Sequence, residues 1–181
     1  MIVTSASGNG GTTFARAIAR RIGAPFVELD ALNHGPGWSE ASAEDLYAQV
    51  APIAASDSWV IDGSYRGKLG DLTFARADAV VWLDQPIYVW LPRLLRRTLG
   101  RLVRGEELWA GNRETLRGAF GRDGLILWTL RNYRRRRREY PSELGRFNLV
   151  RLRTKAQVES FLESCEGVDN AVSVDDIASR A

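Results

Sequence analysis

Short apolar segments alternate with amphipathic segments along the chain, and this alternation constrains the fold more than any other feature. Five segments have strand-like composition: residues 2–4, 25–30, 59–62, 79–84 and 147–152. The segment Ala79–Asp84 is apolar up to its last residue, which is typical of a strand buried on both faces. The alternation predicts an α/β fold, with a five-stranded parallel sheet covered by helices on both faces.

Helical segments are expected between these strands. Phe14, Ile18 and Ile22 recur every four residues, and Gly23 is placed to end that helix. Two further helices have capping-box-like starts, at Ser42 with Asp45 and at Thr154 with Gln157. A long helix is expected to open at Pro86, with four leucines on its inner face: Leu91, Leu95, Leu99 and Leu102.

The segment between the first strand and the first helix, TSASGNGGTT (Thr4–Thr13), is glycine-rich. It fits the phosphate-loop pattern G-x-x-x-x-G-K-[ST] when Gly10 is the second glycine. Ser5 then replaces the first glycine, and Gly11 replaces the lysine. Backbone N–H groups and the helix dipole still favour an anion there. We therefore predict a nucleotide-phosphate site whose residues are Gly8, Asn9, Gly10, Gly11, Thr12 and Thr13; the alternative is a turn that only connects strand to helix.

The lysine position of a phosphate loop opens the helix with ordinary dihedrals. We therefore expect a lysine introduced at Gly11 to be tolerated, provided that Gly11 does not need a positive φ.

The composition of the 181 residues sets broad limits on where the protein works. Cys165 is the only cysteine, which excludes an internal disulfide framework and fits a reducing compartment. No apolar run reaches the length of a membrane span. The first expected strand starts at Ile2, which leaves no room for a signal peptide. The expected location is the cytoplasm, with no membrane partner.

Positive charge is concentrated in the middle of the chain, although the net charge is only +3. Between Arg93 and Arg138 there are 14 arginines against four acidic residues, which indicates an anionic partner for this part. The run RNYRRRRREY (Arg131–Tyr140) has three interpretations: a solvated helix end, a nucleic-acid surface, or a helix that aims one or two arginines at phosphates. A nucleic-acid partner is the least favoured, because no recognised nucleic-acid module is present.

Several motifs resemble those of adenylate-kinase-like P-loop proteins, in particular a bacterial group often named after topology modulation proteins. The motifs are VIDGSYR (Val60–Arg66), LDQPIYVWLPRLLRR (Leu83–Arg97), ELDALNHGPGW (Glu28–Trp38) and EELWAGNRE (Glu106–Glu114). The resemblance extends from Ile2 to Leu162. It implies a three-layer P-loop kinase fold in residues 1–165, with a small helical lid at about 101–124, followed by a tail at 166–181.

The resemblance also implies roles for individual residues. Mg²⁺ with ATP is the implied cofactor, with Thr12 and Asp62 near the metal. Asp30 faces the acceptor and can bind a hydroxyl or act as its base. The arginines have the following implied roles: Arg66 grips an acceptor phosphate, Arg93 lies on the adenine, Arg97 meets the phosphates, and Arg101 extends the same helical face.

Three further residues are candidates from their position in the sequence. His34 and Trp38 follow Asp30 closely and are expected in the acceptor pocket, although a surface histidine or a core tryptophan would need no function. Lys68 lies shortly after Arg66 and is a candidate replacement for the missing lysine. We expect Trp59, Trp82, Trp90 and Trp128 in the core and Trp109 as an anchor of the lid.

The sequence leaves the activity open between several classes. The first is a kinase-like phosphotransferase that uses ATP, a replacement cation, and a small molecule or nucleotide as acceptor. The second is a nucleotide-binding module without catalysis. The third is a non-kinase transferase, because GNGGTTF partly resembles the phosphate loop of sulfotransferases. The kinase-like class is favoured; the acceptor and the oligomeric state stay open.

Overall fold

The sheet has five strands, all parallel, as the alternation predicts. The computed structural model describes residues 1–165. The strands are β1 (Ile2–Ser5), β2 (Phe26–Glu28), β3 (Val60–Asp62), β4 (Val80–Leu83) and β5 (Leu149–Leu152). They lie in the order β2-β3-β1-β4-β5. The chain therefore proceeds to one side of β1 and then to the other, which makes the carboxyl end of β1 the switch point where ligands bind in such sheets.

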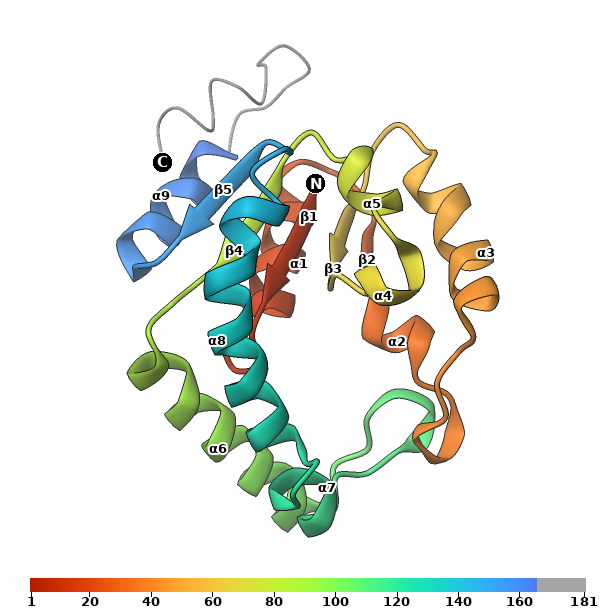
Figure 1. The fold of residues 1–181 in the computed structure, drawn as a ribbon, viewed down its shortest axis with the longest axis vertical. Helices are drawn as coiled ribbons and strands as arrows, with labels where there is room; N and C mark the ends of the chain where they lie inside the picture. Colours follow the sequence, from red (N-terminus) through yellow and green to blue (C-terminus); the bar gives the residue numbers. More distant parts are fainter. Residues whose placement is uncertain (166–181) are drawn as a thin grey trace.

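Helices cover both faces of the sheet (Figure 1). The α-helices are α1 (Gly11–Arg21), α2 (Leu29–Asn33), α3 (Ala43–Ala54), α4 (Arg66–Leu69), α5 (Leu72–Ala75), α6 (Ile87–Arg104), α7 (Leu116–Phe120), α8 (Leu125–Glu143) and α9 (Lys155–Ser164). Two 3₁₀ turns, η1 (Pro36–Trp38) and η2 (Trp109–Gly111), lie in the connecting segments.

Alternate residues of the central strands build two separate cores. Val3 and Val81 pack with Phe14 and Ile18 of α1 and Phe161 of α9 on one face. On the opposite face, Ile2, Val80 and Trp82 pack with residues of α3, α5 and α8. Period-two alternation in buried parallel strands thus produces a three-layer arrangement, with the sheet in the middle.

The expected helix starts are confirmed by their caps. The hydroxyl of Ser42 accepts a hydrogen bond from the backbone N–H of Asp45 at 3.0 Å. Thr154 and Gln157 form the complete capping box. Pro52 lies inside α3 rather than at its end, because the helix continues to Ala54.

The inner face of α6 differs from the prediction by one residue. The buried residues are Trp90, Leu94 and Thr98, whereas Leu99 is 49% exposed. Trp90 and Leu94 form a third core with Ile126 and Tyr133 of α8. Leu91 and Leu95 are partly buried and pack against this core, so the predicted leucine face borders the buried one and only its Leu99 is exposed.

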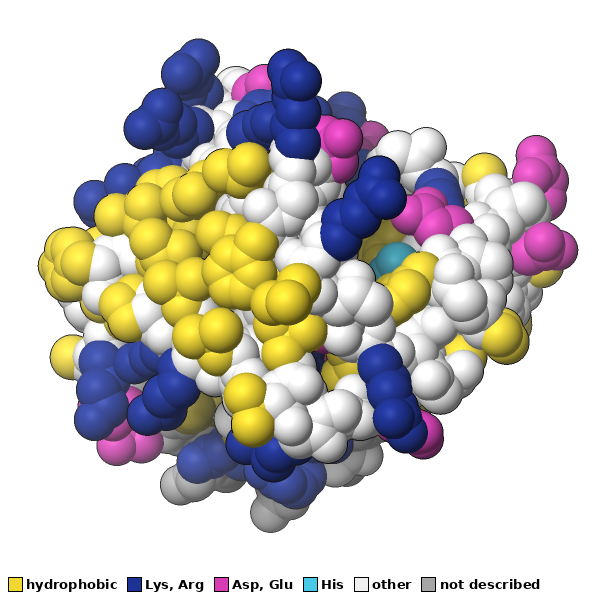
Figure 2. Space-filling model, turned by 90° about the horizontal axis from the view of Figure 1, so that it is seen from below, with side chains coloured by type: hydrophobic (Ala, Val, Ile, Leu, Met, Phe, Trp, Pro, Cys, Tyr) yellow, Lys and Arg dark blue, Asp and Glu magenta, His cyan; other side chains and the backbone are white. Residues whose placement is uncertain are grey.

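The outward side of α6 continues into an apolar surface with α7 and the start of α8. The exposed large side chains there are Leu99, Val103, Leu116, Phe120 and Leu127, whereas the exposed Trp128 lines the cleft. Figure 2 shows hydrophobic side chains gathered on this end of the molecule. Trp128 was expected in the core and is instead 48% exposed, because it lies on the side of α8 away from Ile126 and Tyr133.

The segment between α6 and α8, expected as a lid, contains η2 and α7 and lies at the end of the molecule away from the N-terminus (Figure 1). Within residues 1–165, no helix is long and apolar enough to cross a membrane. The expected tail at 166–181 lies outside the described residues.

Candidate functional site

One large cleft, of about 1980 Å³, opens at the carboxyl ends of β1, β2 and β3. The glycine-rich loop, α2, the start of α4, α6, the lid segment and α8 all contribute to its lining. The cleft therefore joins the phosphate-loop side to the expected acceptor side in a single space, large enough for a nucleotide and a small molecule together.

The loop after β1 is held against α6 and β4. Gly8 has φ +88°, and a Cβ there would lie 2.6 Å from the backbone oxygen of Trp90. Glycine is thus required by both conformation and close approach. The side chain of Asn9 is buried and donates to the backbone oxygen of Leu83 at 3.3 Å. Asn9 therefore anchors the loop rather than lining the cleft, while Gly8, Gly10, Gly11, Thr12 and Thr13 line it.

Gly11 is the first residue of α1, and its backbone has no positive φ, as expected. A Cβ at Gly11 would nevertheless overlap the hydroxyl oxygen of Ser5. The two departures from the phosphate-loop pattern are therefore in direct contact: the serine side chain fills the space in which a lysine side chain would begin. No sequence motif indicated this pairing, and lysine at position 11 alone requires Ser5 to move.

Thr12 and Asp62 meet beside the loop. The Thr12 hydroxyl donates to Asp62 Oδ2 at 2.6 Å and lies 3.5 Å from Glu28 Oε1. Burial raises the pKa of Asp62 to about 6; the Thr12 hydrogen bond opposes this shift, and Asp30 and Glu28 add to it. Burial and Asp30 likewise raise the pKa of Glu28. A cluster of hydroxyl and carboxylate oxygens of this kind is suited to a hard cation.

The side of the cleft expected to hold the acceptor contains Asp30, which lies on α2 rather than at the end of a strand, because β2 ends at Glu28. Tyr65 donates its hydroxyl to Asp30 Oδ1 at 2.7 Å, and its oxygen is 3.4 Å from His34 Nε2. Burial and Asp30 raise the pKa of Tyr65, which keeps the phenol protonated. Tyr65 was missed as a site residue because its partner Asp30 lies 35 residues away, and no local motif indicates their contact.

An aromatic cluster closes the acceptor side. The ring of His34 stacks on Trp109 at 5.8 Å between centroids and meets Trp38 edge-on at 5.6 Å. His34, Trp38 and Trp109 all line the cleft. His34 and Trp38 thus line the same cleft as Asp30, and Trp109 joins them from the segment between α6 and α8.

Asn112 links the lid to the acceptor side. Its amide accepts from the backbone N–H of Trp38 at 2.9 Å and donates to the backbone oxygen of Gly35 at 2.8 Å. Trp38 also donates its indole N–H to the backbone oxygen of Arg113 at 3.3 Å. The segment expected as a lid therefore contacts residues 35–38 beside the cleft.

Two of the candidate cations are already engaged. Arg66 lines the cleft, but its guanidinium donates to Asp71 Oδ1 at 2.9 Å and to Glu143 Oε2 at 2.5 Å. Lys68 Nζ donates to Asn33 Oδ1, Glu40 Oε2 and the backbone oxygen of Ala41, at 2.6–2.8 Å. All three ammonium hydrogens of Lys68 are thus used in joining α4 to the α2–α3 connection.

The arginines of α6 divide between two environments. Arg97 and Arg101 line the cleft, and Arg101 pairs with Glu114 at 3.0 Å. Burial, followed by the charge of Arg101, lowers the pKa of Arg97, which stays cationic. Arg93 is absent from the lining and donates to Gln85 at 3.2 Å. Arg97 and Arg101, which are four residues apart, therefore both line the cleft. Arg93, four residues before Arg97, does not.

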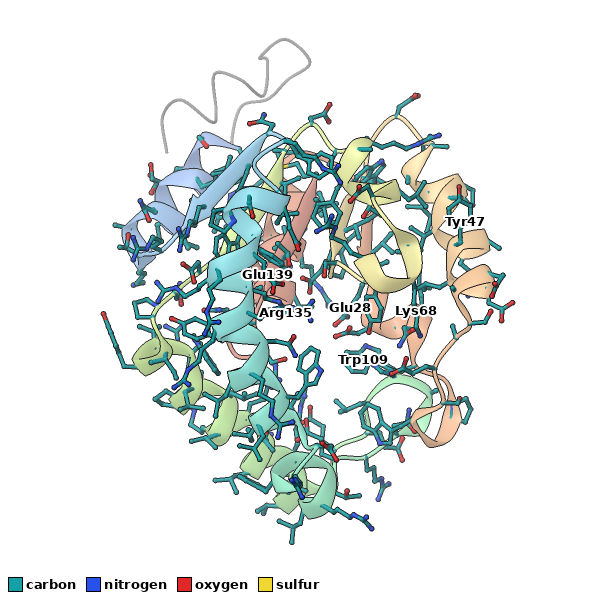
Figure 3. The ribbon with its side chains drawn as sticks, viewed as in Figure 1. Glu28, Tyr47, Lys68, Trp109, Arg135 and Glu139 are labelled. Carbon is teal, nitrogen blue, oxygen red and sulfur yellow. The ribbon has the colours of Figure 1, made fainter. Side chains whose placement is uncertain are left out.

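The arginine run lies on α8, which packs against the sheet. Arg135 and Arg136 line the cleft. Arg135 pairs with Glu139 at 2.9 Å, and both project from the side of α8 that faces Glu28 (Figure 3). Arg136 donates to the backbone oxygen of Ser5 and lies over the Tyr140 ring. Arg137 instead pairs with buried Asp84 at 3.0 Å. The interpretation in which a helix aims one or two arginines at the phosphate side thus agrees best with this geometry.

Comparison with known proteins identifies the fold. No family model and no curated protein matches the chain. Among solved structures, a shikimate kinase from Bacteroides thetaiotaomicron is 19% identical, with a TM-score of 0.51 over 90% of this chain and 92% of that one. A sugar kinase from a Janibacter species is 18% identical, with a TM-score of 0.51 over 99% and 96%. A shikimate kinase from Aquifex aeolicus is 15% identical, with a TM-score of 0.50 over 92% and 97%.

These matches and the topology show a three-layer P-loop kinase-like fold. At identities below 20% they show the fold alone. The fold expected from the adenylate-kinase-like motifs is confirmed, while the roles of individual residues remain predictions.

Proposed function

We propose that this protein is a P-loop kinase that transfers the γ-phosphoryl group of ATP to a hydroxyl group of a small molecule. The observation that carries the proposal is the hydrogen bond between Thr12 and Asp62 at the start of α1. It places a hydroxyl and a carboxylate beside the phosphate loop, in the same cleft as Asp30. Phosphoryl transfer depends mainly on such positioning and on charge stabilisation.

Mg²⁺ fits the residues beside the loop. Thr12, Asp62 and Glu28 offer only oxygen atoms, and the raised pKa of Asp62 comes from burial and nearby negative charge that a divalent cation would relieve. Within residues 1–165, no group of three or more histidine, cysteine or acidic side chains forms a complete metal cage. This pattern suits Mg²⁺, which is usually bound by one or two carboxylates together with phosphates and water. Bound there, the ion neutralises charge on the outer phosphates.

Asp30 is the proposed base. The acceptor oxygen forms a bond to the γ-phosphorus, and the bond from that phosphorus to the β–γ bridging oxygen breaks. ADP leaves, and the hydroxyl proton passes to Asp30. Tyr65 fixes one oxygen of Asp30 by donating to it, which leaves the other oxygen for the acceptor. Arg97, which lies in the cleft within the electrostatic reach of Asp30, is proposed to contact the transferring phosphoryl group.

The charges around Asp30 favour a neutral or cationic acceptor. Among the described residues, ten acidic side chains and seven arginines line the cleft. Arg66 is neutralised by Asp71 and Glu143, and Arg101 by Glu106 and Glu114. An acceptor with its own carboxylate or phosphate would add negative charge beside Asp30 and Glu28. The arginine of α4, Arg66, is already paired and is not free to balance that charge. We therefore propose a polyhydroxyl or amino-hydroxyl compound that stacks on the His34–Trp109 pair.

The test measures nucleotide binding and transfer separately. We expect Mg-ATP to raise the melting temperature, and γ-labelled ATP to label neutral or amino-bearing polyols in preference to carboxylated ones. Asp30→Asn should retain Mg-ATP binding and lose transfer by roughly 10²–10⁴-fold. Mg-ATP binding without transfer to any hydroxyl compound would favour a nucleotide-binding module. Metal-independent binding of a 3′-phosphorylated adenosine nucleotide, in place of Mg-ATP, would favour the sulfotransferase-like alternative.

A further inference from the structure

The loop lacks its lysine, and the structure shows where that side chain would begin. The overlap of a Cβ at Gly11 with Ser5 Oγ means that a side chain at position 11 starts beside Ser5. A cation that replaces the missing lysine is therefore expected close to Ser5, the first residue of the loop. A cation that replaces the lysine has to reach Ser5 and the cleft from another element.

Two of the cations near the cleft do not meet this requirement. Lys68 is absent from the cleft lining, and its three ammonium hydrogens are used by Asn33, Glu40 and Ala41. Arg135 lines the cleft but is paired with Glu139 on its own helix at 2.9 Å. Both are therefore engaged away from the loop.

Arg136, in contrast, reaches both Ser5 and the cleft. Its guanidinium donates to the backbone oxygen of Ser5, so a positive charge from α8 lies at the first residue of the loop. The guanidinium is 5.7 Å from the centroid of the Tyr140 ring, and the Tyr140 hydroxyl is 3.5 Å from Thr4 Oγ1. Among the described residues, Arg136 has no ion-pair partner, and it lines the cleft. It is thus a positioned cation that is not neutralised by a carboxylate.

We propose that Arg136 takes the place of the phosphate-loop lysine and supplies the positive charge to the outer phosphates of the bound nucleotide. This proposal rests on the proposed function, because it assumes that a nucleotide binds in the loop. A guanidinium presents planar paired donors that match phosphate oxygens, so it is chemically suited to this replacement. The serine at position 5 and the glycine at position 11 then belong to one arrangement. Ser5 fills the space in which a side chain at position 11 would begin, and Arg136 approaches the loop from α8.

The experiment compares nucleotide affinity by calorimetry in the full chain. We expect Arg136→Ala to weaken Mg-ATP binding by about 10- to 100-fold, the range for one charge-assisted contact. Arg136→Lys should lose less, because it keeps the charge. The effect should be largest for ATP and smallest for AMP, since the contact is with the outer phosphates. Arg138→Ala is the matched control: Arg138 is exposed, on the same helix, and absent from the cleft lining.

A rescue variant tests the assignment directly. Ser5→Gly removes the side chain that overlaps position 11, so Ser5→Gly with Gly11→Lys rebuilds the ordinary loop. Added to Arg136→Ala, this pair should restore Mg-ATP affinity to within a few-fold of the parent. Melting temperatures without ligand confirm that each variant folds, and Arg136→Lys provides the test if Arg136→Ala does not fold.

Three outcomes would contradict either the proposed role of Arg136 or the proposed kinase function. Equal ATP affinities of Arg136→Ala and Arg138→Ala would overturn the role of Arg136 and leave the proposed function standing. That role is likewise overturned if the rebuilt loop folds but leaves ATP binding by Arg136→Ala as weak as before. If the parent binds no adenine nucleotide with or without Mg²⁺, the proposed function itself fails.

Discussion

Asp62 lies in an environment that is unfavourable for its charge in the ligand-free protein. Burial, with the negative charges of Asp30 and Glu28, raises its pKa from 3.8 to about 6 despite the hydrogen bond from Thr12. Between these values the folded protein holds the proton more tightly than the unfolded chain does. The free energy of unfolding therefore falls as the pH rises from about 4 to about 6, and stays lowered above that range.

Removing this charge should stabilise the protein without metal. In the absence of divalent cations, Asp62→Asn is expected to raise the free energy of unfolding at pH 7.5 by about 1–3 kcal/mol. The asparagine oxygen still accepts from Thr12, so the local hydrogen bond is kept. Urea denaturation at pH 7.5 and pH 4 measures the effect, which should be much smaller at pH 4. Asp57→Asn, at an exposed position, is the control. An equal free energy of unfolding in Asp62→Asn and parent at pH 7.5 would refute this account.

At the scale of elements, local sequence signals predicted the strands and the helix caps. Ser42 with Asp45 and Thr154 with Gln157 determine their helix starts through contacts three residues apart. The inner face of α6 was not predictable in this way, because leucines make two of its sides apolar. Which side is buried depends on Gly8 and α8, which approach α6 from distant parts of the chain.

The residues of the candidate site likewise divide into those that local motifs indicate and those whose roles depend on contacts with distant parts of the chain. The glycine-rich loop and Asp62 followed from local motifs, whereas Tyr65, Glu28 and Arg136 gain their roles from partners 35, 16 and 131 residues away. The sequence left three interpretations of the arginine run open, since successive residues of a helix point about 100° apart and the sequence does not show which of them face the cleft. Arg136 faces the loop, while the next residue, Arg137, faces Asp84.

Helix α8 is attached to the sheet through Asp84 at the end of β4. This carboxylate is 1% exposed and accepts from Arg137 Nε at 3.1 Å and from Arg151 Nε at 3.0 Å. Asp84→Ala leaves two arginines without their shared acceptor, so we expect the free energy of unfolding to fall by about 3–5 kcal/mol. Arg137→Ala should cost less, because Arg151 still pairs with Asp84. Chemical denaturation measures both, and a loss below about 0.5 kcal/mol for Asp84→Ala, the level of ordinary surface substitutions, would show that the pairs do not hold α8.

At the scale of the whole molecule, two similar loops, at residues 34–40 and 107–113, meet beside the cleft. One is closed by an antiparallel bridge between His34 and Glu40, and the other by a bridge between Glu107 and Arg113. Each contains two successive residues with positive φ: Gly37 and Trp38 in the first, and Ala110 and Gly111 in the second. Their 3₁₀ turns pack against each other. The contact between these loops therefore joins two irregular segments and does not involve the sheet.

Asn112 supplies two hydrogen bonds between these loops, and its removal should loosen their contact selectively. Asn112→Ala deletes the bonds to Trp38 and Gly35, each worth about 0.5–1.5 kcal/mol. The free energy of local opening should fall by about 1–3 kcal/mol, which speeds hydrogen exchange at the Trp38 amide roughly 5- to 150-fold. Global stability should change little, because the two cores on the sheet do not include the lid. Asn148→Ala, which deletes a bond to Asp78 far from the cleft, is the matched control. Unchanged exchange at Trp38 in Asn112→Ala would mean that the Trp38–Arg113 hydrogen bond and the aromatic contacts of His34, Trp38 and Trp109 keep the two loops together.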